Sequence, residues 1–138
     1  MKTRRLSTLL SLLLLVLTGC NEGHEQVLLD IKSCDLKPAT SCPGADLSGQ
    51  NLSGMDLHSS VFVGTNFDGA DLSETILLDA NLTNASMRGT NLLGANLINA
   101  KLDGIVWENT TCPDGTNSDD NLGTCCGHLN DVLLLTEC

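Results

Sequence analysis

The sequence is short of basic and aromatic side chains. Its 138 residues hold seven Lys and Arg against seventeen Asp and Glu, with two Phe, one Trp and no Tyr. Contact with nucleic-acid phosphates needs a basic patch, so we expect no nucleic-acid binding. The chain also lacks a GxSxG nucleophile elbow and a glycine-rich phosphate loop, and His24 and His58 have no recognisable partner in the sequence. We therefore predict a protein that is not an enzyme and takes no cofactor.

The sequence also lacks an apolar run long enough for a membrane-spanning helix. Leu6 to Leu17 is apolar but much shorter than the ~20 residues that a span needs. A basic start precedes this run and Leu17-Thr18-Gly19-Cys20 follows it, an order typical of an export signal. The last four residues resemble the bacterial lipobox, which implies cleavage before Cys20 and a lipid on its thiol. The alternative is an ordinary secretory signal with an incidental Cys.

Loss of residues 1–19, the expected lipoprotein signal peptide, makes the chain more acidic. That segment holds three of the seven Lys and Arg, so the mature chain has a formal charge of 4 − 17 = −13. Acyl chains such as palmitate on Cys20 would hold the mature protein on a membrane. We expect a membrane-anchored lipoprotein of the cell envelope, periplasmic or surface-exposed, whose acidity serves solubility or a basic partner.

What the sequence does contain is a five-residue repeat over residues 45–109. A large apolar residue is central to each unit: Leu47, Leu52, Leu57, Phe62, Phe67, Leu72, Leu77, Leu82, Met87, Leu92, Leu97, Leu102 and Trp107. A small residue stands two places earlier in most units, Asp or Asn stands between the two in eight units, and Gly often closes the unit. Period five fits neither a helix nor an alternating strand, and so short a unit must coil and stack to bury its apolar residue.

The units resemble the A(D/N)LXX unit of the pentapeptide-repeat family, since ADLSG, ADLSE, ANLTN and ANLIN all occur here. The resemblance implies an all-β fold, a right-handed quadrilateral β-helix with four units in each twenty-residue coil, and therefore about three coils. Counting units by fours places Leu47, Phe67, Met87 and Trp107 in one column. That the bulkier residues Phe67, Met87 and Trp107 share a column supports four units per coil.

Segments rich in Cys flank the repeat. Residues 20–44 are expected to form a lipid-anchored tether and an N-terminal cap, with the apolar run Val27–Ile31 over the open end, and residues 110–138 a C-terminal cap. With Cys20 lipidated, six Cys remain for disulfides in an oxidising compartment, which allows fifteen pairings. Short loops favour the pairs Cys34–Cys42, Cys112–Cys125 and Cys126–Cys138, because they close readily.

Some outward positions of the repeat carry apolar residues. Ile76, Leu78 and Ile98 are expected to share one face, with Val61 and Val63 on the next face around. Contiguous apolar surface on a small domain usually marks a contact, so these five residues are candidates for binding an envelope protein or a second copy. The alternative is that the chain's own tail covers them, because it contains Leu129 and the run Val132–Leu135.

The tail also contains side-chain oxygens of the kind that calcium binds. Asp114, Asn117, Asp119 and Asn121 are the candidates, but the EF-hand register fails because Leu122 stands where Gly is needed and His128 where Glu is needed. Cys125, Cys126 and His128 lack the second spaced pair of a zinc site. We therefore predict no metal, and keep the calcium loop as an alternative.

These observations predict a non-catalytic, lipid-anchored structural or protein-binding module of the bacterial cell envelope. A calcium-dependent adhesion or matrix protein is the alternative, and it depends on the tail loop. The family resemblance adds a third reading, an acidic DNA mimic that binds DNA gyrase. The signal peptide, the extra Cys and the small number of coils argue against that reading.

Overall fold

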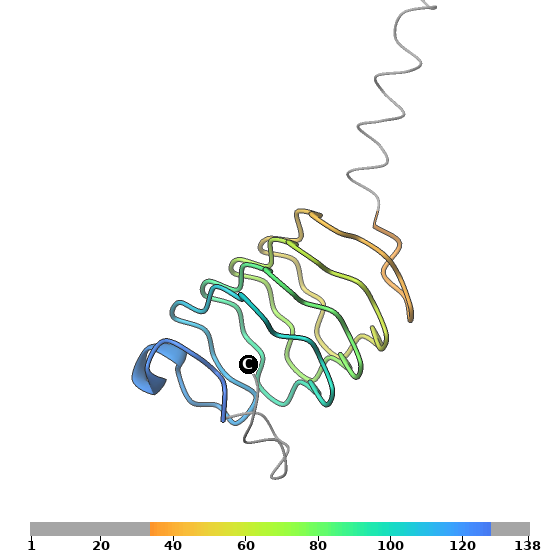
Figure 1. The fold of residues 1–138 in the computed structure, drawn as a ribbon. Coiled ribbons are helices and arrows are strands. Elements are labelled where there is room, and N and C mark those ends of the chain that lie inside the picture. The colour runs from red at the N-terminus through yellow and green to blue at the C-terminus, as the bar shows by residue number, and fades with distance from the viewer. Residues whose placement is uncertain (1–33, 128–138) are drawn as a thin grey trace, which may run out of the picture. The chain divides into compact units, whose positions relative to one another are not determined.

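The computed structural model describes residues 34–127, which wind into stacked coils (Figure 1). Isolated parallel bridges join residues twenty apart, from Ser41–Val61 through to Asn91–Thr111, with one bridge for every five residues. Twenty residues per coil is four units per coil, as the column of bulky residues predicted. The bridges extend slightly beyond residues 45–109 at both ends.

Each coil contributes single bridges to the ladder instead of extended strands. The one regular element among residues 34–127 is the 3-10 helix η1, Ser118–Asn121. The chain turns every five residues, so no straight stretch is long enough for a strand of ordinary length. Hydrogen bonds still join the coils in the parallel manner: Asn81 donates to the carbonyl of Ser60 at 2.8 Å and accepts from Phe62 at 2.7 Å.

A tight turn follows each central residue. The carbonyl of Phe67, for example, accepts from the backbone N–H of Ala70 at 2.8 Å. The third residue of each turn has a positive φ, as in a type II turn, which explains why Gly closes so many units. The same site in three successive coils holds Gly54, Glu74 and Gly94, with φ of 67°, 57° and 70°. Glu74 therefore adopts a left-handed conformation that suits glycine.

The Asp or Asn that precedes the central residue also has a structural role in the turn. In all eight units that carry one, its Oδ1 accepts from the backbone N–H two residues later: Asp46, Asn51, Asp56, Asn66, Asp71, Asn81, Asn91 and Asn96. This is the Asx turn that these short side chains favour. The polar position of the repeat therefore stabilises the backbone as well as facing water.

The core consists of the central residues of the units, which stack in one column along each side of the tube. Leu57, Phe62, Phe67, Leu72, Leu77, Leu82, Met87 and Leu92 are fully buried, whereas Trp107 is half-buried at the last turn. Phe62 and Phe67 meet edge to face with centroids 5.3 Å apart. The small residues are inward as predicted, and some are more than fillers. Buried Thr65, Thr75 and Thr90 donate from Oγ1 to carbonyls twenty-three residues earlier, at 2.7–2.9 Å.

Disulfides lie close to both ends of the coil. They join Cys34 to Cys42 and Cys112 to Cys125, two of the three expected pairs. Cys126 is disulfide-bonded as well, and its expected partner Cys138 lies outside the described residues. Also outside the described residues are Cys20, the run Val27–Ile31 and the apolar tail residues Leu129 and Val132–Leu135.

Candidate functional site

The buried polar side chains of the described coil are engaged in hydrogen bonds. Among residues 34–127, every buried side-chain nitrogen and oxygen has a hydrogen-bond partner. The same part of the chain holds no group of three or more His, Cys, Asp or Glu that is arranged to bind a metal ion. Whatever this domain binds is therefore expected to meet its outer surface or its ends.

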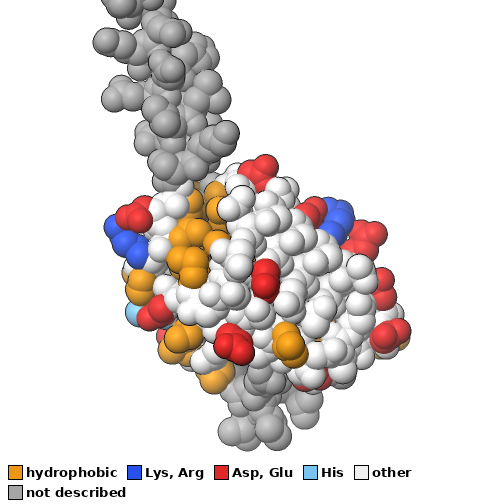
Figure 2. Space-filling model, turned by 180° about the vertical axis from the view of Figure 1, so that it is seen from behind, with side chains coloured by type: hydrophobic (Ala, Val, Ile, Leu, Met, Phe, Trp, Pro, Cys, Tyr) orange, Lys and Arg blue, Asp and Glu red, His pale blue; other side chains and the backbone are white. Residues whose placement is uncertain are grey.

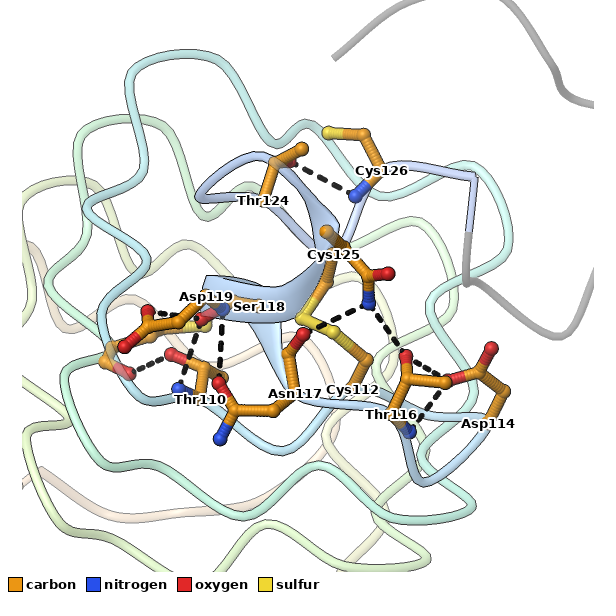
Figure 3. The surroundings of a disulfide bond; sticks show 12 residues. Thr110, Cys112, Asp114, Thr116, Asn117, Ser118, Asp119, Thr124, Cys125 and Cys126 are labelled. Carbon is orange, nitrogen blue, oxygen red and sulfur yellow. Dashed lines mark hydrogen bonds between the residues drawn. A yellow bond between two sulfur atoms is a disulfide. The ribbon is translucent and has the colours of Figure 1, made fainter.

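The candidate calcium residues are used to build the C-terminal cap (Figure 3). Asp114 Oδ1 accepts from the backbone N–H of Thr116 at 2.9 Å and from its hydroxyl at 2.7 Å. Asn117 is the N-cap of η1, because its Oδ1 accepts from the N–H of Asp119 at 2.9 Å. These are local turn and cap contacts of the kind that Asp, Asn and Ser favour.

The other two candidates tie this cap together. Asp119 Oδ1 accepts from the backbone N–H of Asn109 at 2.8 Å, which fastens η1 to the last coil. Asn121 Nδ2 donates to the hydroxyl of Thr116 at 2.8 Å and to the carbonyl of Asn117 at 2.9 Å. Asp114 and Asn121 thus share the hydroxyl of Thr116, and all four candidates are engaged in hydrogen bonds within the cap. The loop's composition is explained by capping.

Disulfide bonding argues against a zinc site at Cys125 and Cys126. Cys125 is joined to Cys112 and lies buried beside η1, and Cys126 is disulfide-bonded too. A cysteine binds zinc as a free thiolate, which neither sulfur offers in this state. His128 lies outside the described residues.

His58 has a partner, contrary to the reading of the sequence. Its Nδ1 lies 2.8 Å from Asp56 Oδ1, and both side chains are about half exposed. The hydrogen bond from the His58 side chain, followed by the one from its backbone N–H, lowers the pKa of Asp56. Side chains two residues apart on one side of a coil point in the same direction. The spacing of Asp56 and His58 was therefore a signal in the sequence that we did not use. The buried Ser60 hydroxyl donates to the carbonyl of Lys37 at 3.4 Å, so Ser60 is not the partner of His58.

A second polar column crosses three coils on the opposite side of the tube. Arg88 Nε donates to Glu108 Oε2 at 2.9 Å, and Arg88 Nη1 lies 3.7 Å from Asp68 Oδ2. The hydroxyl of Ser86 donates to Asp68 Oδ1 at 2.6 Å within the same group. The guanidinium is therefore held between two carboxylates of this chain. Such exposed pairs contribute little to stability but leave this cation engaged.

The apolar candidates divide into two groups. The side of the tube formed by residues 55–59, 75–79 and 95–99, which we call the Leu77 face, carries Ile76, Leu78 and Ile98. Ile76 is 39% and Ile98 38% exposed, and Leu78 is half-buried. Val61 and Val63, on the next side, are half-buried and are not among the exposed large apolar residues. The structure thus favours the Leu77 face over the Val61 and Val63 positions as an apolar surface.

Three further apolar residues are exposed that the reading of the sequence did not put forward as binding candidates. Leu93 is 50% exposed, Val106 39%, and Leu122 fully exposed at the end of η1. Each stands on a different part of the surface from the Leu77 face, and none has an exposed apolar neighbour two residues away in sequence. Leu122 gave no periodic signal because it lies outside the repeat.

Charge is spread over this surface. Residues 34–127 carry twelve Asp and Glu against three Lys and Arg. In the view of Figure 2 the acidic side chains are scattered over the surface and not gathered into one patch. Hydrogen bonds from the side chain and backbone of Ser48 lower the pKa of Asp46, and those from Ser73 act likewise on Asp71.

The architecture defines a class, the parallel β-solenoid with a twenty-residue coil. Comparison with protein families then identifies the repeat: the model described as pentapeptide repeats matches eight copies over residues 41–77 and 75–105. Residues 41–105 of this chain therefore belong to the pentapeptide-repeat family, whose fold is a right-handed quadrilateral β-helix. Members are typically non-catalytic protein-interaction modules.

Solved structures of pentapeptide repeat proteins are similar to this chain. Rfr23 from the cyanobacterium Cyanothece is 31% identical, with 53% of this chain and 58% of that chain covered and a TM-score of 0.24. HetL from Nostoc, involved in heterocyst differentiation regulation, is 28% identical, with 56% and 42% covered and a TM-score of 0.23. A protein of the Arabidopsis thaliana thylakoid lumen is 25% identical, with 72% and 83% covered and a TM-score of 0.29.

The alignments cover little more than half of the first of these proteins and less than half of the second. All three TM-scores are low, so the fold follows from this chain's own bridge register and from the family match. Comparison with curated proteins finds no match. Within residues 34–127 there is no helix of the length and apolarity that crossing a bilayer requires.

Proposed function

We propose that this chain is a non-catalytic, lipid-anchored module of the bacterial cell envelope, a short coil with clamped ends that acts by holding or contacting another protein. Cys20 of the lipobox-like Leu17–Cys20 segment is the anchor, carrying acyl chains that retain the mature domain on a membrane. Residues from Cys34 onward then form the displayed domain, with about three coils of repeat.

The observation that carries this proposal is the pair of disulfides near the two ends of the repeat. Disulfides persist in oxidising compartments and are rare in the cytosol, so Cys34–Cys42 and Cys112–Cys125 support export. They also suit a coil this short, which buries few large side chains and gains from closed loops at its ends. The same pairs argue against a cytoplasmic gyrase-binding role.

The binding part of the proposal has a separate basis. Every buried side-chain nitrogen and oxygen of residues 34–127 has a hydrogen-bond partner, and the surface is acidic with one apolar face. A domain with this surface can act by contact without any chemistry of its own. The family's typical use as an interaction module is in keeping with this.

Labelling with radioactive palmitate followed by membrane fractionation tests the anchor. We expect label on the wild-type chain and its recovery in the membrane fraction, with both lost in Cys20→Ser. A matched Cys126→Ser variant keeps its lipid and its membrane location, because that sulfur lies in the C-terminal cap. Label that persists in Cys20→Ser, or a wild-type chain recovered unlabelled in the soluble fraction, would refute lipid anchoring.

The calcium alternative makes an opposite prediction about metal removal. Because Asp114, Asn117 and Asp119 accept hydrogen bonds within the cap, we expect EDTA to leave the melting temperature of the purified protein unchanged. A fall on adding EDTA that calcium reverses and magnesium does not would favour the adhesion or matrix reading instead.

A further inference from the structure

The Leu77 face combines apolar and acidic side chains in a fixed grid. Successive coils place Asp56, Ile76 and Asn96 in one bridged column. The neighbouring outward column holds His58, Leu78 and Ile98, because the register is twenty residues. Stacked coils lie about 4.8 Å apart, so Ile76, Leu78 and Ile98 form one contiguous apolar group.

Carboxylates border this apolar group. Asp56 precedes Ile76 in its column and holds His58 through the 2.8 Å contact with Nδ1. Asp79 follows Leu78 directly, and its Oδ1 accepts at 3.0 Å from Nδ2 of Asn99, the residue after Ile98 in the next coil. Glu74 stands at the corner before Ile76 and is exposed.

No Lys or Arg belongs to residues 55–59, 75–79 or 95–99, which form this face. The three cations of residues 34–127 lie elsewhere. Lys37 is paired with Asp35 at the N-terminal end, Arg88 is held between Asp68 and Glu108, and Lys101 belongs to the next side of the tube. Of the carboxylates that border the Leu77 face, Asp79 and Glu74 are therefore not paired with a Lys or Arg of residues 34–127, whereas Asp56 is paired with His58.

We propose that the Leu77 face is the docking surface for a cationic amphipathic segment of another protein, with Leu or Ile side chains set on Ile76, Leu78 and Ile98 and Lys or Arg beside Asp56 and Asp79. Charge complementarity selects this occupant. A second copy of the chain would bring the same carboxylates to the contact, an anionic lipid surface would repel them, and the tail residues 128–138 are themselves acidic.

This inference rests on the proposed function in one respect, that the chain acts by contacting a protein. It adds which face does so and what chemistry that face recognises. The apolar centre would supply most of the affinity, and the bordering charges would supply selectivity and rate of association. Asp79 has a defined role here, because Asn99 holds its carboxylate in place without neutralising its charge.

The test uses the full chain, purified from the membrane fraction and placed in neutral phosphatidylcholine nanodiscs, with empty discs as the reference. The probe is a synthetic helical peptide with Leu along one face and Lys on its flanks, measured by surface plasmon resonance. A second peptide carries Glu in place of every Lys. Phosphatidylglycerol vesicles are the third analyte.

We expect the Lys peptide to bind and the Glu peptide not to bind. Ile76→Ser with Ile98→Ser should weaken binding about tenfold, whereas the matched control Leu93→Ser, at a more exposed site on another side, should leave it unchanged. Asp79→Asn keeps the bond from Asn99 but removes the charge. It should weaken binding about threefold and reduce its salt dependence. The control Asp103→Asn removes an exposed carboxylate from the next side of the tube, residues 100–104, and should do neither.

Several results would overturn the proposal. Equal binding of the two peptides, or equal losses in the face variants and their controls, would mean that the Leu77 face does not select a cationic partner. Tighter binding to the anionic vesicles than to the Lys peptide would make it a membrane surface. A dimer in sedimentation that Ile76→Ser with Ile98→Ser abolishes would make it a self-association surface. Lipid anchoring is read from the palmitate labelling, so the two proposals fail separately.

Discussion

Replacing Glu74 with Gly should stabilise the protein, although it removes a side chain. Glu74 occupies the turn site that Gly54 and Gly94 occupy in the coils before and after it, and its φ is 57°. A non-glycine residue in this left-handed region costs about 1–2 kcal/mol. Glycine loses roughly 0.5–1 kcal/mol more conformational entropy on folding, which offsets part of the gain. The expected net gain is about 0.5–1 kcal/mol.

Little packing is lost in this substitution. Glu74 is exposed, and its Cγ lies 3.5 Å from the point where a Cβ on Gly94 would stand, a position that glycine leaves empty. Its backbone N–H donates to the carbonyl of Leu93 at 2.8 Å, a bond that glycine keeps. For a domain of this size the gain corresponds to a rise of roughly 3–6 °C in melting temperature.

Calorimetry of the oxidised protein measures this rise, with Glu74→Gln as the matched control. Gln keeps the left-handed strain and the side-chain length but removes the charge, so we expect no change beyond about 0.5 kcal/mol. If Glu74→Gly gives no gain, the repeated turn does not have the geometry described here. If Glu74→Gln gives the same gain, charge repulsion and not backbone strain explains the effect.

Three other predictions concern the core, the acid response and the clamps. Met87→Ala, at a fully buried position, should cost about 2–5 kcal/mol in chemical denaturation, and a loss below 1 kcal/mol would contradict a close-packed column. Hydrogen bonds, first from the Ser73 side chain, lower the pKa of Asp71, so the ionised Asp71 stabilises the fold above the ordinary carboxyl pKa, and this stabilisation is lost as pH falls through the lowered pKa. The melting temperature of Asp71→Asn should therefore fall less on acidification than that of the wild type. Equal dependence of the melting temperature on pH in the two proteins would refute this. Replacing both Cys112 and Cys125 with Ser should cost about 3 kcal/mol, and equal melting temperatures with and without the pair would show that the cap needs no clamp.

The repeat could be read from the sequence because its period fixes the contacts. Once every fifth residue is large and apolar, stacking is the way to bury it, and twenty-residue columns place Phe67 beneath Leu47 and Met87 beneath Phe67. Burial of these central residues and of the small residues followed directly. The turn role of residues such as Asp46 and Asn81 was also present in the sequence, since each stands two places before a turn N–H.

The surface could be read only in part, because it depends on what stacks beside each residue. Ile76 and Ile98 were placed correctly on one face, but Val61 and Val63 have the same outward spacing and are half-buried. The contact of His58 with Asp56 depends on side-chain direction, which composition does not give.

The C-terminal cap follows no period at all. Asp114 and Asn117 read equally well as ligands or as caps until their backbone donors are known. Asp119 Oδ1 accepts from Asn109, ten residues away, and Asn121 Nδ2 donates to Thr116, five residues away. The spacing of the residues in the sequence does not reveal these contacts.

The intact mass of the native protein, taken from the membrane fraction without reducing agent, tests the central claim most directly. The account predicts a chain that begins at Cys20, carries the added mass of acyl chains and lacks two hydrogens for each of three disulfides. A soluble, full-length, reduced and unacylated chain would contradict it. The envelope location would then fall, and the cytoplasmic alternatives would have to be taken up again.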